Sequence, residues 1–260
     1  MLTPEGLKEQ AKLLGLPLNK QRAIIREYAQ TIVLKAIYQS EVGQKLCFKG
    51  GTALRFAYGL GRFSEDLDFN GKGLTAEEFS AVITICRKAL THEGFKCVTS
   101  VKTREKIQAG WIKITNILQE YKITNIKAEK LMIKLEVSNP DWSVQSEPAV
   151  IDRYGYLYTI SLMEKGAIFA EKIDALLRRC RGRDIYDLIF MLRNKFPIDQ
   201  QVFAAKGWQA EPRQAIQECI DAIKPAELPR LAKQLETFLL KNEEIDYVLN
   251  AKTYVKALLK

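Results

Sequence analysis

Histidine is nearly absent from this chain, since His92 is the only one among 260 residues. His92 precedes Glu93 and Gly94 in a pattern typical of a helix end, so we assign it no catalytic role. Hydrolysis through a Ser-His or Cys-His arrangement needs a histidine as the base, and no nucleophile signature accompanies this one. The sequence therefore argues against hydrolases of that kind.

Paired cysteines and long apolar runs are also missing. The five cysteines form no Cys-x-x-Cys pair and are odd in number, which is typical of reduced, mostly buried thiols and argues against a zinc site. No segment approaches the roughly 18 consecutive apolar residues that a membrane span requires. Charged residues at helical intervals in the first twenty positions are unlike a signal peptide. We expect a cytoplasmic protein with no membrane partner.

Positive charge is in excess, with 40 Lys and Arg against 31 Asp and Glu, a net charge of +9. A basic surface attracts phosphate-rich molecules, so a polyanionic partner is one interpretation. The other is that the charge only keeps the protein soluble. The hydrophobic content of 47% is that of an ordinary globular protein.

The hydrophobic pattern predicts an α/β (α+β) protein. Residues 3–13 and 20–39 have helical spacing, and residues 46–140 combine short apolar runs, glycine turns and one helix opened by a capping box. Beyond Asn139-Pro140 the pattern becomes mainly helical. We expect a mixed sheet with flanking helices in residues 1–155 and a mainly helical region in residues 156–260.

The segment Asp66-Leu67-Asp68 is the first candidate for chemistry. A strand sends alternate side chains to one face, so Asp66 and Asp68 would converge while Leu67 points away. Two neighbouring carboxylates repel unless a divalent cation, a basic residue or a shared proton holds them together. Mg²⁺ is the useful solution, because it also binds the phosphates of a nucleotide.

A glycine turn at Gly50-Gly51-Thr52 supplies a complementary feature. Glycines let backbone N–H groups approach a phosphate closely, and a following helix would present its positive dipole end. Thr52 would add a hydroxyl group at this place. Each motif alone is usually only a turn or a solvated strand end, but their combination predicts an NTP site.

Three residues just before Asp66 and Asp68 each have a separate possible role. Arg62 could hold phosphate, Ser64 could fix the loop, and Glu65 could simply be solvated.

Lys172 is predicted to lie on the apolar stripe of a helix, together with Ile168 and Leu176. A bare ammonium there would be costly, so an anionic partner is expected. The partner is either an NTP phosphate or Asp184 or Asp187 in a structural ion pair.

The next predicted helix places Arg183 and Asp187 four residues apart, which suits a surface ion pair and leaves Asp184 as the better active-site candidate. A dense basic cluster precedes it. The cluster suits phosphate contacts with a nucleotide or RNA, or it is a solvated helix end. Its members are Arg178, Arg179, Arg181 and Arg183.

Residues 49–55 (Lys-Gly-Gly-Thr-Ala-Leu-Arg) and 62–69 (Arg-Phe-Ser-Glu-Asp-Leu-Asp-Phe) resemble the first motif of the AbiEii/AbiGii toxin family, within the DNA polymerase β-like superfamily. The family usually has Gly-Ser where this chain has Gly-Thr at 51–52, and the hydroxyl is kept. Residues 171–179 and 182–188 are similar to its later motifs.

This resemblance implies a nucleotidyltransferase-like fold whose active-site cleft is completed by residues 156–260. It also implies a third carboxylate on a later strand, for which Glu136 is the best candidate as a metal ligand beside Asp66 and Asp68. Alternatively, Lys134 and Glu136 form an exposed polar row on one strand face. The implied catalytic residues are Asp66, Asp68, Lys172 and Asp184, and the implied nucleotide-binding residues are Gly50, Gly51, Thr52, Arg62, Ser64 and Lys172.

The function that follows is a nucleotidyltransferase that uses Mg²⁺ or Mn²⁺ and an NTP to modify an acceptor, an RNA such as tRNA. The resemblance further implies a toxin of a toxin–antitoxin or abortive-infection system, with a cognate antitoxin as partner. Two alternatives stay open: a kinase-like phosphotransferase, and a non-catalytic nucleic-acid or protein-binding module on the same fold. Retention of Asp66, Asp68 and Thr52 counts against the binding module, which has no need for two repelling carboxylates.

Overall fold

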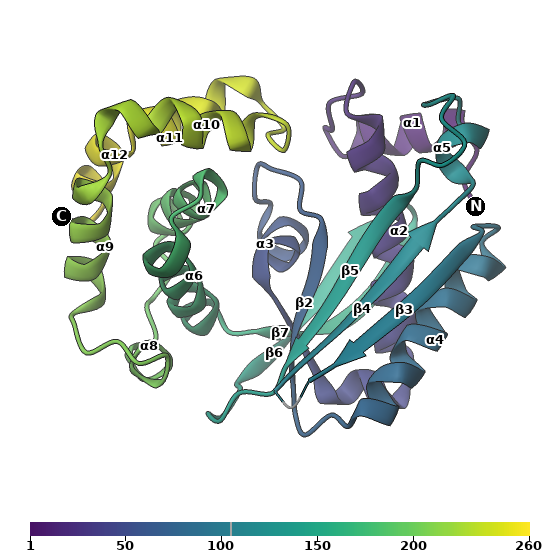
Figure 1. Ribbon diagram of the computed structural model, residues 1–260, viewed down its shortest axis with the longest axis horizontal. Coiled ribbons are helices and arrows are strands. Elements are labelled where there is room, and N and C mark those ends of the chain that lie inside the picture. Colours follow the sequence, from purple (N-terminus) through teal and green to yellow (C-terminus); the bar gives the residue numbers. More distant parts are fainter. Residues whose placement is uncertain (105) are drawn as a thin grey trace. The chain divides into compact units, whose positions relative to one another are not determined.

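The computed structural model describes residues 1–104 and 106–260, which form two compact units (Figure 1). Unit 1 consists of Met1–Gly59 and Phe63–Leu162. Unit 2 consists of Leu60–Arg62 and Met163–Lys260. In the described part of the chain, none of the helices has the length and apolar character that crossing a membrane requires.

Unit 1 contains the sheet and the helices that cover it. Its helices are α1 (Pro4–Leu13), α2 (Gln21–Tyr38), the 3-10 helix η1 (Glu41–Lys45), α3 (Gly50–Tyr58), α4 (Ala76–His92) and α5 (Ile117–Glu120). Its strands are β1 (Leu46–Lys49), β2 (Asp66–Gly71), β3 (Cys97–Thr103), β4 (Ile107–Ile114), β5 (Leu131–Ser138), β6 (Ser146–Arg153) and β7 (Tyr156–Met163). The two N-terminal helices and the capping box that opens α4 confirm the sequence predictions.

The seven strands form one mixed sheet in the order β3-β4-β5-β2-β1-β7-β6. Strand β2 lies at its centre, antiparallel to β1 and parallel to β5. Strand β4 pairs antiparallel with both β3 and β5, and β1 pairs parallel with β7. A mixed sheet with flanking helices is the fold class expected from the sequence.

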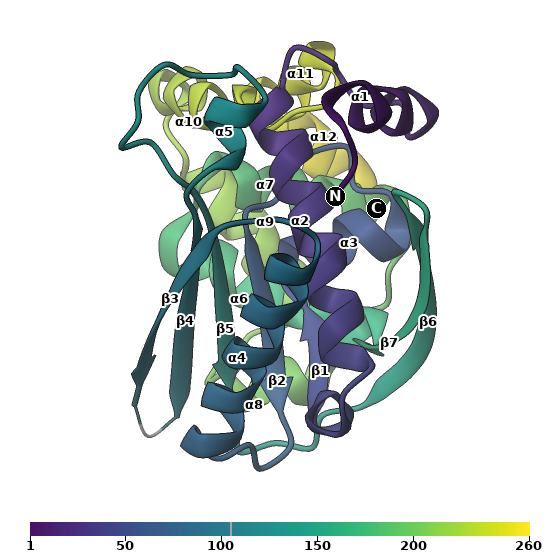
Figure 2. The same ribbon diagram turned by 90° about the vertical axis from the view of Figure 1, so that its right-hand side faces the viewer.

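Helices α2 and α4 pack against each other and cover one face of this sheet (Figure 2). Strand β5 shows the pattern that results, because Ile133 and Leu135 are fully buried while Lys134 and Glu136 between and after them are partly exposed. Gly110 in β4 lies so close to α4 that a Cβ atom there would be 2.3 Å from Ile83 Cδ1. The face opposite α4 is the one that carries the charged side chains of β5.

The prediction of mainly helical structure beyond residue 140 is wrong for residues 146–163, which form strands β6 and β7. In β7, Tyr158, Ile160 and Leu162 are buried at every second position, a strand period that the following long helix obscures. The hairpin turns at Tyr154 and Gly155, which both have positive φ. The strand is completed only by its long-range pairing with β1.

Unit 2 is helical. Its helices are α6 (Lys165–Arg179), α7 (Gly182–Arg193), α8 (Gln200–Ala205), α9 (Pro212–Ala222), η2 (Pro225–Glu227), α10 (Leu228–Glu236), η3 (Asn242–Ile245), α11 (Asp246–Leu249) and α12 (Ala251–Leu258). Helix α7 packs against α6, α10, α11 and α12 and forms the centre of the unit. At Gly182, a Cβ atom would lie 1.9 Å from the Leu231 carbonyl oxygen, so the start of α7 directly abuts α10.

Candidate active site

The two carboxylates of the Asp-Leu-Asp motif lie on one face of strand β2. Asp66 and Asp68 are partly exposed, whereas Leu67 and Phe69 are fully buried. The alternation follows from the two-residue period of a strand. The pair therefore shares the face of the sheet that lies opposite the covering helices.

Gly50 brings the glycine turn to one of these carboxylates. It opens α3 with a φ of +81°, in the left-handed region that favours glycine. A Cβ atom at this position would lie 2.5 Å from Asp68 Oδ2, so the carboxylate packs directly against the glycine backbone. Lys49 and Asp68 are Cα partners in the antiparallel ladder of β1 and β2, which fixes this approach.

The first turn of α3 offers backbone N–H groups and the positive end of the helix dipole at the same place. Lys49, the N-cap residue, makes no side-chain capping bond, and the first turn contains no acidic residue. The N–H groups of a helix N-terminus bind anionic oxygens. Gly50 and Gly51 can therefore hold a phosphate beside Asp68.

Thr52 serves the scaffold. Its hydroxyl donates a hydrogen bond to the main-chain carbonyl of Asp66, and the residue is 1% exposed. This hydroxyl is the group predicted to face a phosphate, but its proton joins the first turn of α3 to the start of β2. Thr52 thus positions the acidic pair against the glycine turn.

The loop before β2 is held by helix α2. The Gln30 side-chain amide donates to the carbonyl oxygens of Ser64 at 3.1 Å and Glu65 at 2.9 Å. Arg26 Nη1 also lies 2.6 Å from Glu65 Oε1. Gln30 therefore holds the loop at Ser64 through the backbone carbonyl of that residue.

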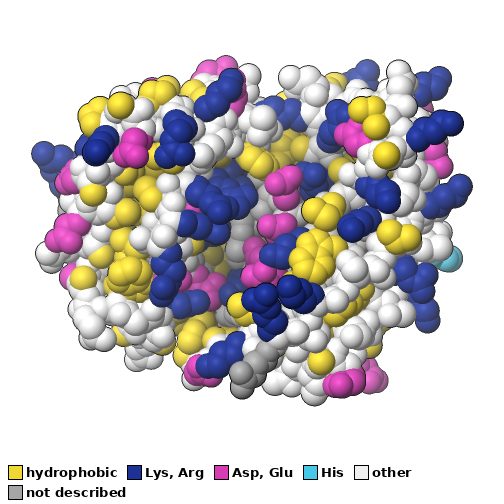
Figure 3. Space-filling model, in the orientation of Figure 1, with side chains coloured by type: hydrophobic (Ala, Val, Ile, Leu, Met, Phe, Trp, Pro, Cys, Tyr) yellow, Lys and Arg dark blue, Asp and Glu magenta, His cyan; other side chains and the backbone are white. Residues whose placement is uncertain are grey.

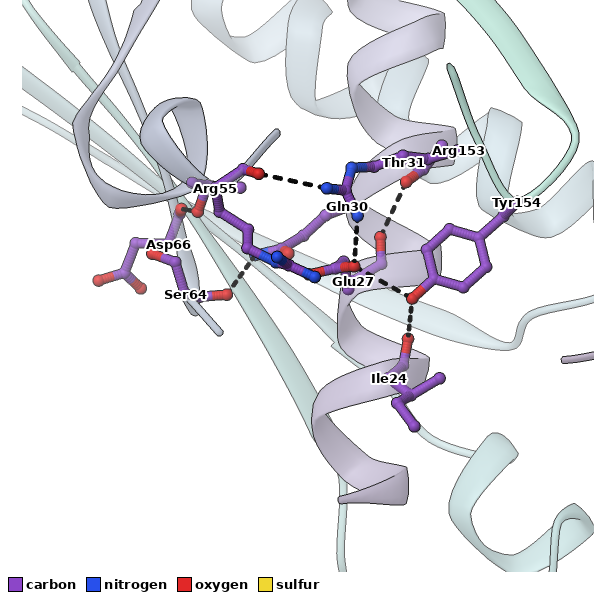
Figure 4. Close-up of polar contacts among 10 residues, drawn as sticks. Ile24, Glu27, Gln30, Thr31, Arg55, Ser64, Asp66, Arg153 and Tyr154 are labelled. Carbon is purple, nitrogen blue, oxygen red and sulfur yellow. Dashed lines mark hydrogen bonds and ion pairs between the residues drawn. The ribbon is translucent and has the colours of Figure 1, made fainter. Parts of the chain in front are cut away.

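A buried ionic network anchors α3 to α2 as well. Glu27 is 2% exposed, and its two carboxylate oxygens accept from Arg55 Nε and Arg153 Nη1, each at 2.9 Å. Tyr154 donates to the same carboxylate at 3.3 Å. Figure 4 shows Arg55 of α3 and Arg153 at the end of β6 converging on Glu27, with the Asp66 carboxylate pointing away from the network.

This network was not predicted from the sequence, although a signal for it was present. Glu27 and Gln30 lie on the apolar side of α2, and both are buried there. A buried charge has to be paired, so an acidic residue within the apolar pattern of α2 indicates a basic partner elsewhere in the chain.

Glu136 and Lys134 of β5 lie next to the acidic pair. Asp66 is the Cα partner of Lys134, and Asp68 is the Cα partner of Glu136. The two β5 side chains form an ion pair, the polar row that the sequence analysis considered for them. Burial works to lower the pKa of Lys134, but Glu136, Asp66 and Asp68 outweigh it and raise that pKa. The Lys134 ammonium group therefore lies among three carboxylates on this face.

The donor set fits a hard divalent cation in part. No group of three or more His, Cys, Asp or Glu side chains is arranged to hold a metal ion within residues 1–104 and 106–260. Mg²⁺ in phosphoryl-transfer sites uses one or two carboxylates and completes its shell with water and substrate phosphate. Asp66 and Asp68, with Asp68 against the Gly50 cradle, meet that smaller requirement.

In unit 2, Asp187 is the centre of a buried ionic cluster. It is fully buried and accepts from Arg62 Nε and Arg62 Nη2, each at 2.6 Å, and from Lys172 Nζ at 2.7 Å. Burial works to raise the pKa of Asp187, but Arg62 and Lys172 outweigh it and lower that pKa to about 2. Asp187 is therefore ionised at neutral pH.

This cluster overturns the predicted pair of Arg183 and Asp187, and it shows which anionic partner Lys172 has. Asp187 pairs with Arg62 and Lys172 inside unit 2, so the surface pair with Arg183 is wrong. The apolar stripe of α6 places Lys172 over the next helix, and its partner there is Asp187. Arg62, expected at a phosphate, is 3% exposed and holds Asp187 through two nitrogens.

Asp184 caps helix α7. It accepts from Arg179 Nε at 3.0 Å, from Arg179 Nη2 at 2.9 Å and from the backbone N–H of Arg181 at 3.2 Å. Asp184 is fully buried. Arg178 is bound locally too, through Asp174 at 2.6 Å and the Lys206 carbonyl at 3.0 Å. Two of the four arginines of the basic cluster, Arg178 and Arg179, are thus tied to their own unit by carboxylates and a carbonyl.

Comparison with known proteins identifies the family. The sequence profile of the nucleotidyl transferase AbiEii toxins, of type IV toxin–antitoxin systems, matches residues 32–252. The chain belongs to the AbiEii family. The match includes both the residues around the Gly50 turn in unit 1 and the ion cluster of α6 and α7 in unit 2. No curated protein matches the sequence significantly.

Solved structures support the fold of this AbiEii protein. JHP933 from Helicobacter pylori is 18% identical with a TM-score of 0.58, and the match covers 91% of each chain. MenT4, a nucleotidyltransferase toxin from Mycobacterium tuberculosis, is 18% identical with a TM-score of 0.59, covering 98% of this chain and 90% of that one. At these identities the likeness is one of fold.

Proposed function

We propose that this AbiEii protein is a metal-dependent nucleotidyltransferase that uses an NTP to modify an RNA acceptor such as tRNA. We further propose that it acts as a toxin controlled by a cognate antitoxin protein. The observation that supports the chemistry best is the packing of the Asp68 carboxylate against Gly50 at the open N-terminus of α3. That arrangement pairs a cation-binding group with a phosphate-binding one.

The roles in unit 1 follow from this juxtaposition. Gly50 and Gly51 bind the triphosphate through backbone N–H groups. Asp66 and Asp68 are the proposed ligands of Mg²⁺ or Mn²⁺, and Glu136 is the third once it releases Lys134. The bound ion supplies charge neutralisation for the phosphate groups in the transition state.

The proposed reaction is an in-line displacement. An acceptor hydroxyl oxygen forms a bond to the α-phosphorus, the bond between the α-phosphorus and the bridging oxygen breaks, and pyrophosphate leaves. The hydroxyl proton is taken by a carboxylate on this face. The protein contributes mainly by holding the two reactants in line.

For unit 2, Lys172 and Asp184 are proposed as catalytic-motif residues from the family resemblance. Asp187 binds the Lys172 ammonium group and holds it in place, so a phosphate contact requires that Lys172 exchange or share this partner. Arg179 and the backbone of Arg181 hold Asp184, which suits a positioning role at the start of α7. Arg62 would act through Asp187.

An assay with NTPs labelled at the α or the γ phosphorus distinguishes the possible reactions. The purified full chain is incubated with Mg²⁺, total tRNA and each NTP in turn. We expect RNA to retain the α label and not the γ label. Retention of the γ label alone would show a kinase, and retention of neither would contradict a transferase acting on these substrates.

Asp66→Asn tests the site itself. We expect transfer to fall by at least a hundred-fold, because the loss of a charge at the reacting centre is far costlier than at a solvated position. Asp152→Asn, at an exposed carboxylate of the same sheet, is the matched control and should keep full activity. Equal melting temperatures show that the fold is intact. Full transfer by Asp66→Asn would show that Asp66 is not part of the active site.

A further inference from the structure

A row of side chains runs across the sheet from the acidic pair to a tryptophan. Asp66 is the Cα partner of Lys134, Lys134 is the partner of Trp111, and Trp111 is the partner of Ser100. Cα partners in a ladder point to the same face. Since neighbouring strands lie about 4.8 Å apart, Trp111 stands about 10 Å from the catalytic strand on the catalytic face.

The face that carries Trp111 is opposite the one packed by helix α4. Gly110 and Ile112, on either side of Trp111 in β4, are buried, and Gly110 abuts the α4 side chain of Ile83. Trp111 itself is partly exposed. Its indole ring is therefore available to a ligand that lies on the sheet.

The surroundings of Trp111 are basic and apolar. Lys113 and Met132 are Cα partners in the adjacent row, and both are exposed. Lys102 is exposed on β3 and pairs with Ala109 on the other side. Strands β3 and β4 contain no acidic residue. Figure 3 shows hydrophobic side chains over β4 and β5, with Lys and Arg side chains next to them and acidic side chains nearby.

We propose that Trp111 stacks a base of the single-stranded end of the RNA acceptor, with Lys102 and Lys113 contacting its phosphates. Aromatic rings within a basic groove are the usual means of binding single-stranded nucleic acid, because every base offers a flat face for stacking. This inference rests on the proposed function. It adds Trp111, which lies on β4, to a site that otherwise consists of the Gly50 turn and the acidic pair on β2.

The order of the strands favours the acceptor over the incoming NTP as the occupant. The Gly50 turn follows β1 on one side of β2, whereas β5 and β4 lie on the other side. In-line attack places the nucleophile opposite the leaving pyrophosphate. With the triphosphate held at Gly50, the acceptor approaches over β5 and β4, where Trp111 is.

Kinetics of Trp111→Ala test the assignment. We expect the KM for RNA to rise roughly ten-fold, as for loss of one stacked base, while the KM for NTP and kcat stay close to wild type. Trp111→Phe, which keeps a ring, should restore most of the affinity. Leu157→Ala, at an exposed apolar residue of β7, is the control and should leave the KM for RNA unchanged.

Fluorescence gives a readout that does not need activity. Stacking a base on an indole quenches its emission, so an RNA oligonucleotide of roughly ten residues should quench the wild type. The quenching should be largely lost in Trp111→Phe, which retains Trp142 and Trp208.

The outcomes separate the two proposals. An unchanged KM for RNA in Trp111→Ala, or full quenching in Trp111→Phe, overturns the stacking site. If Trp111→Ala raises only the KM for NTP, the indole ring binds the incoming nucleotide, and the proposal that it binds the RNA acceptor is wrong. Quenching that depends on Trp111 in a protein that transfers nothing supports the stacking site while the proposed function fails.

Discussion

At the scale of single residues, Gly50 is restricted to glycine by two independent constraints. Its φ of +81° is unfavourable for any residue with a Cβ atom, and the Asp68 carboxylate occupies the position that a Cβ atom would take. Gly59, at the other end of α3, has only the first constraint: its φ is +74° and no atom lies within 4 Å of a built Cβ. The two glycines therefore separate backbone strain from displacement of the carboxylate.

Gly50→Ala should reduce transfer on the order of a hundred-fold, because displacement of a catalytic group by about 1 Å has effects of that size. Gly59→Ala should keep its activity and lose only about 1 kcal/mol of stability, the cost of a left-handed alanine. Steady-state kinetics and urea unfolding measure the two effects. Equal activity losses in both variants would mean that the Asp68 contact has no catalytic importance.

Thr52 and Asp68 show how a motif residue acquires its role. The hydroxyl of Thr52 lies in the first turn of α3, but it binds the backbone of β2. Asp68 lies against the glycine turn, where a phosphate-bound cation would be. One residue of the motif thus supports the site and another forms it.

At the scale of elements, helix α2 holds the site together. Its Glu27 binds Arg55 of α3, and its Gln30 binds the two residues that lead into β2. The strand and the helix that contribute the proposed catalytic groups are therefore attached to the same helix. Burial makes this attachment costly to break, because two guanidinium groups share one carboxylate.

Glu27→Gln should lower the free energy of unfolding by about 3–5 kcal/mol, the usual effect of removing one partner from a buried ion pair. Glu129→Gln removes the partner of Arg22 on the same helix, where Arg22 is 50% exposed, and should cost less than about 1 kcal/mol. Chemical denaturation of both variants tests this. Similar losses would show that the buried network is no more important than a surface pair.

At the scale of the whole molecule, the ion cluster around Asp187 in unit 2 makes the free energy of unfolding decrease at low pH. The folded-state pKa of Asp187, about 2, lies below the value of 3.8 for an ordinary Asp. Its stabilising effect is therefore complete above about pH 4 and is lost as the pH falls through about 2. The difference corresponds to about 2 kcal/mol.

We expect urea unfolding of the full chain to weaken between pH 4 and 2, and the Asp187 carboxyl carbon to titrate near pH 2 by NMR. Asp187→Asn should lose this part of the pH dependence. If the variant does not fold, the NMR titration of the wild type still decides the matter. A carboxyl titration near pH 4 would show that Arg62 and Lys172 do not stabilise the ionised form.

The sequence by itself determined the local features of this protein. Glycine at positive φ, the capping box of Thr75 and Glu78, and the alternation of Asp66 and Asp68 on a strand depend on neighbours along the chain. The motif residues around Gly50 were for the same reason sufficient to indicate the AbiEii family, which the family profile then showed.

Only the tertiary structure decided which partners these residues have. Glu27 meets Arg153 across 126 positions of sequence, Arg62 meets Asp187 across 125, and β7 is completed by its pairing with β1. Such contacts depend on how strands and helices pack, and a spacing pattern contains no information on that packing. A charged residue in an apolar helix shows that a partner must exist, because burying it alone is too costly, but the fold determines which residue it is.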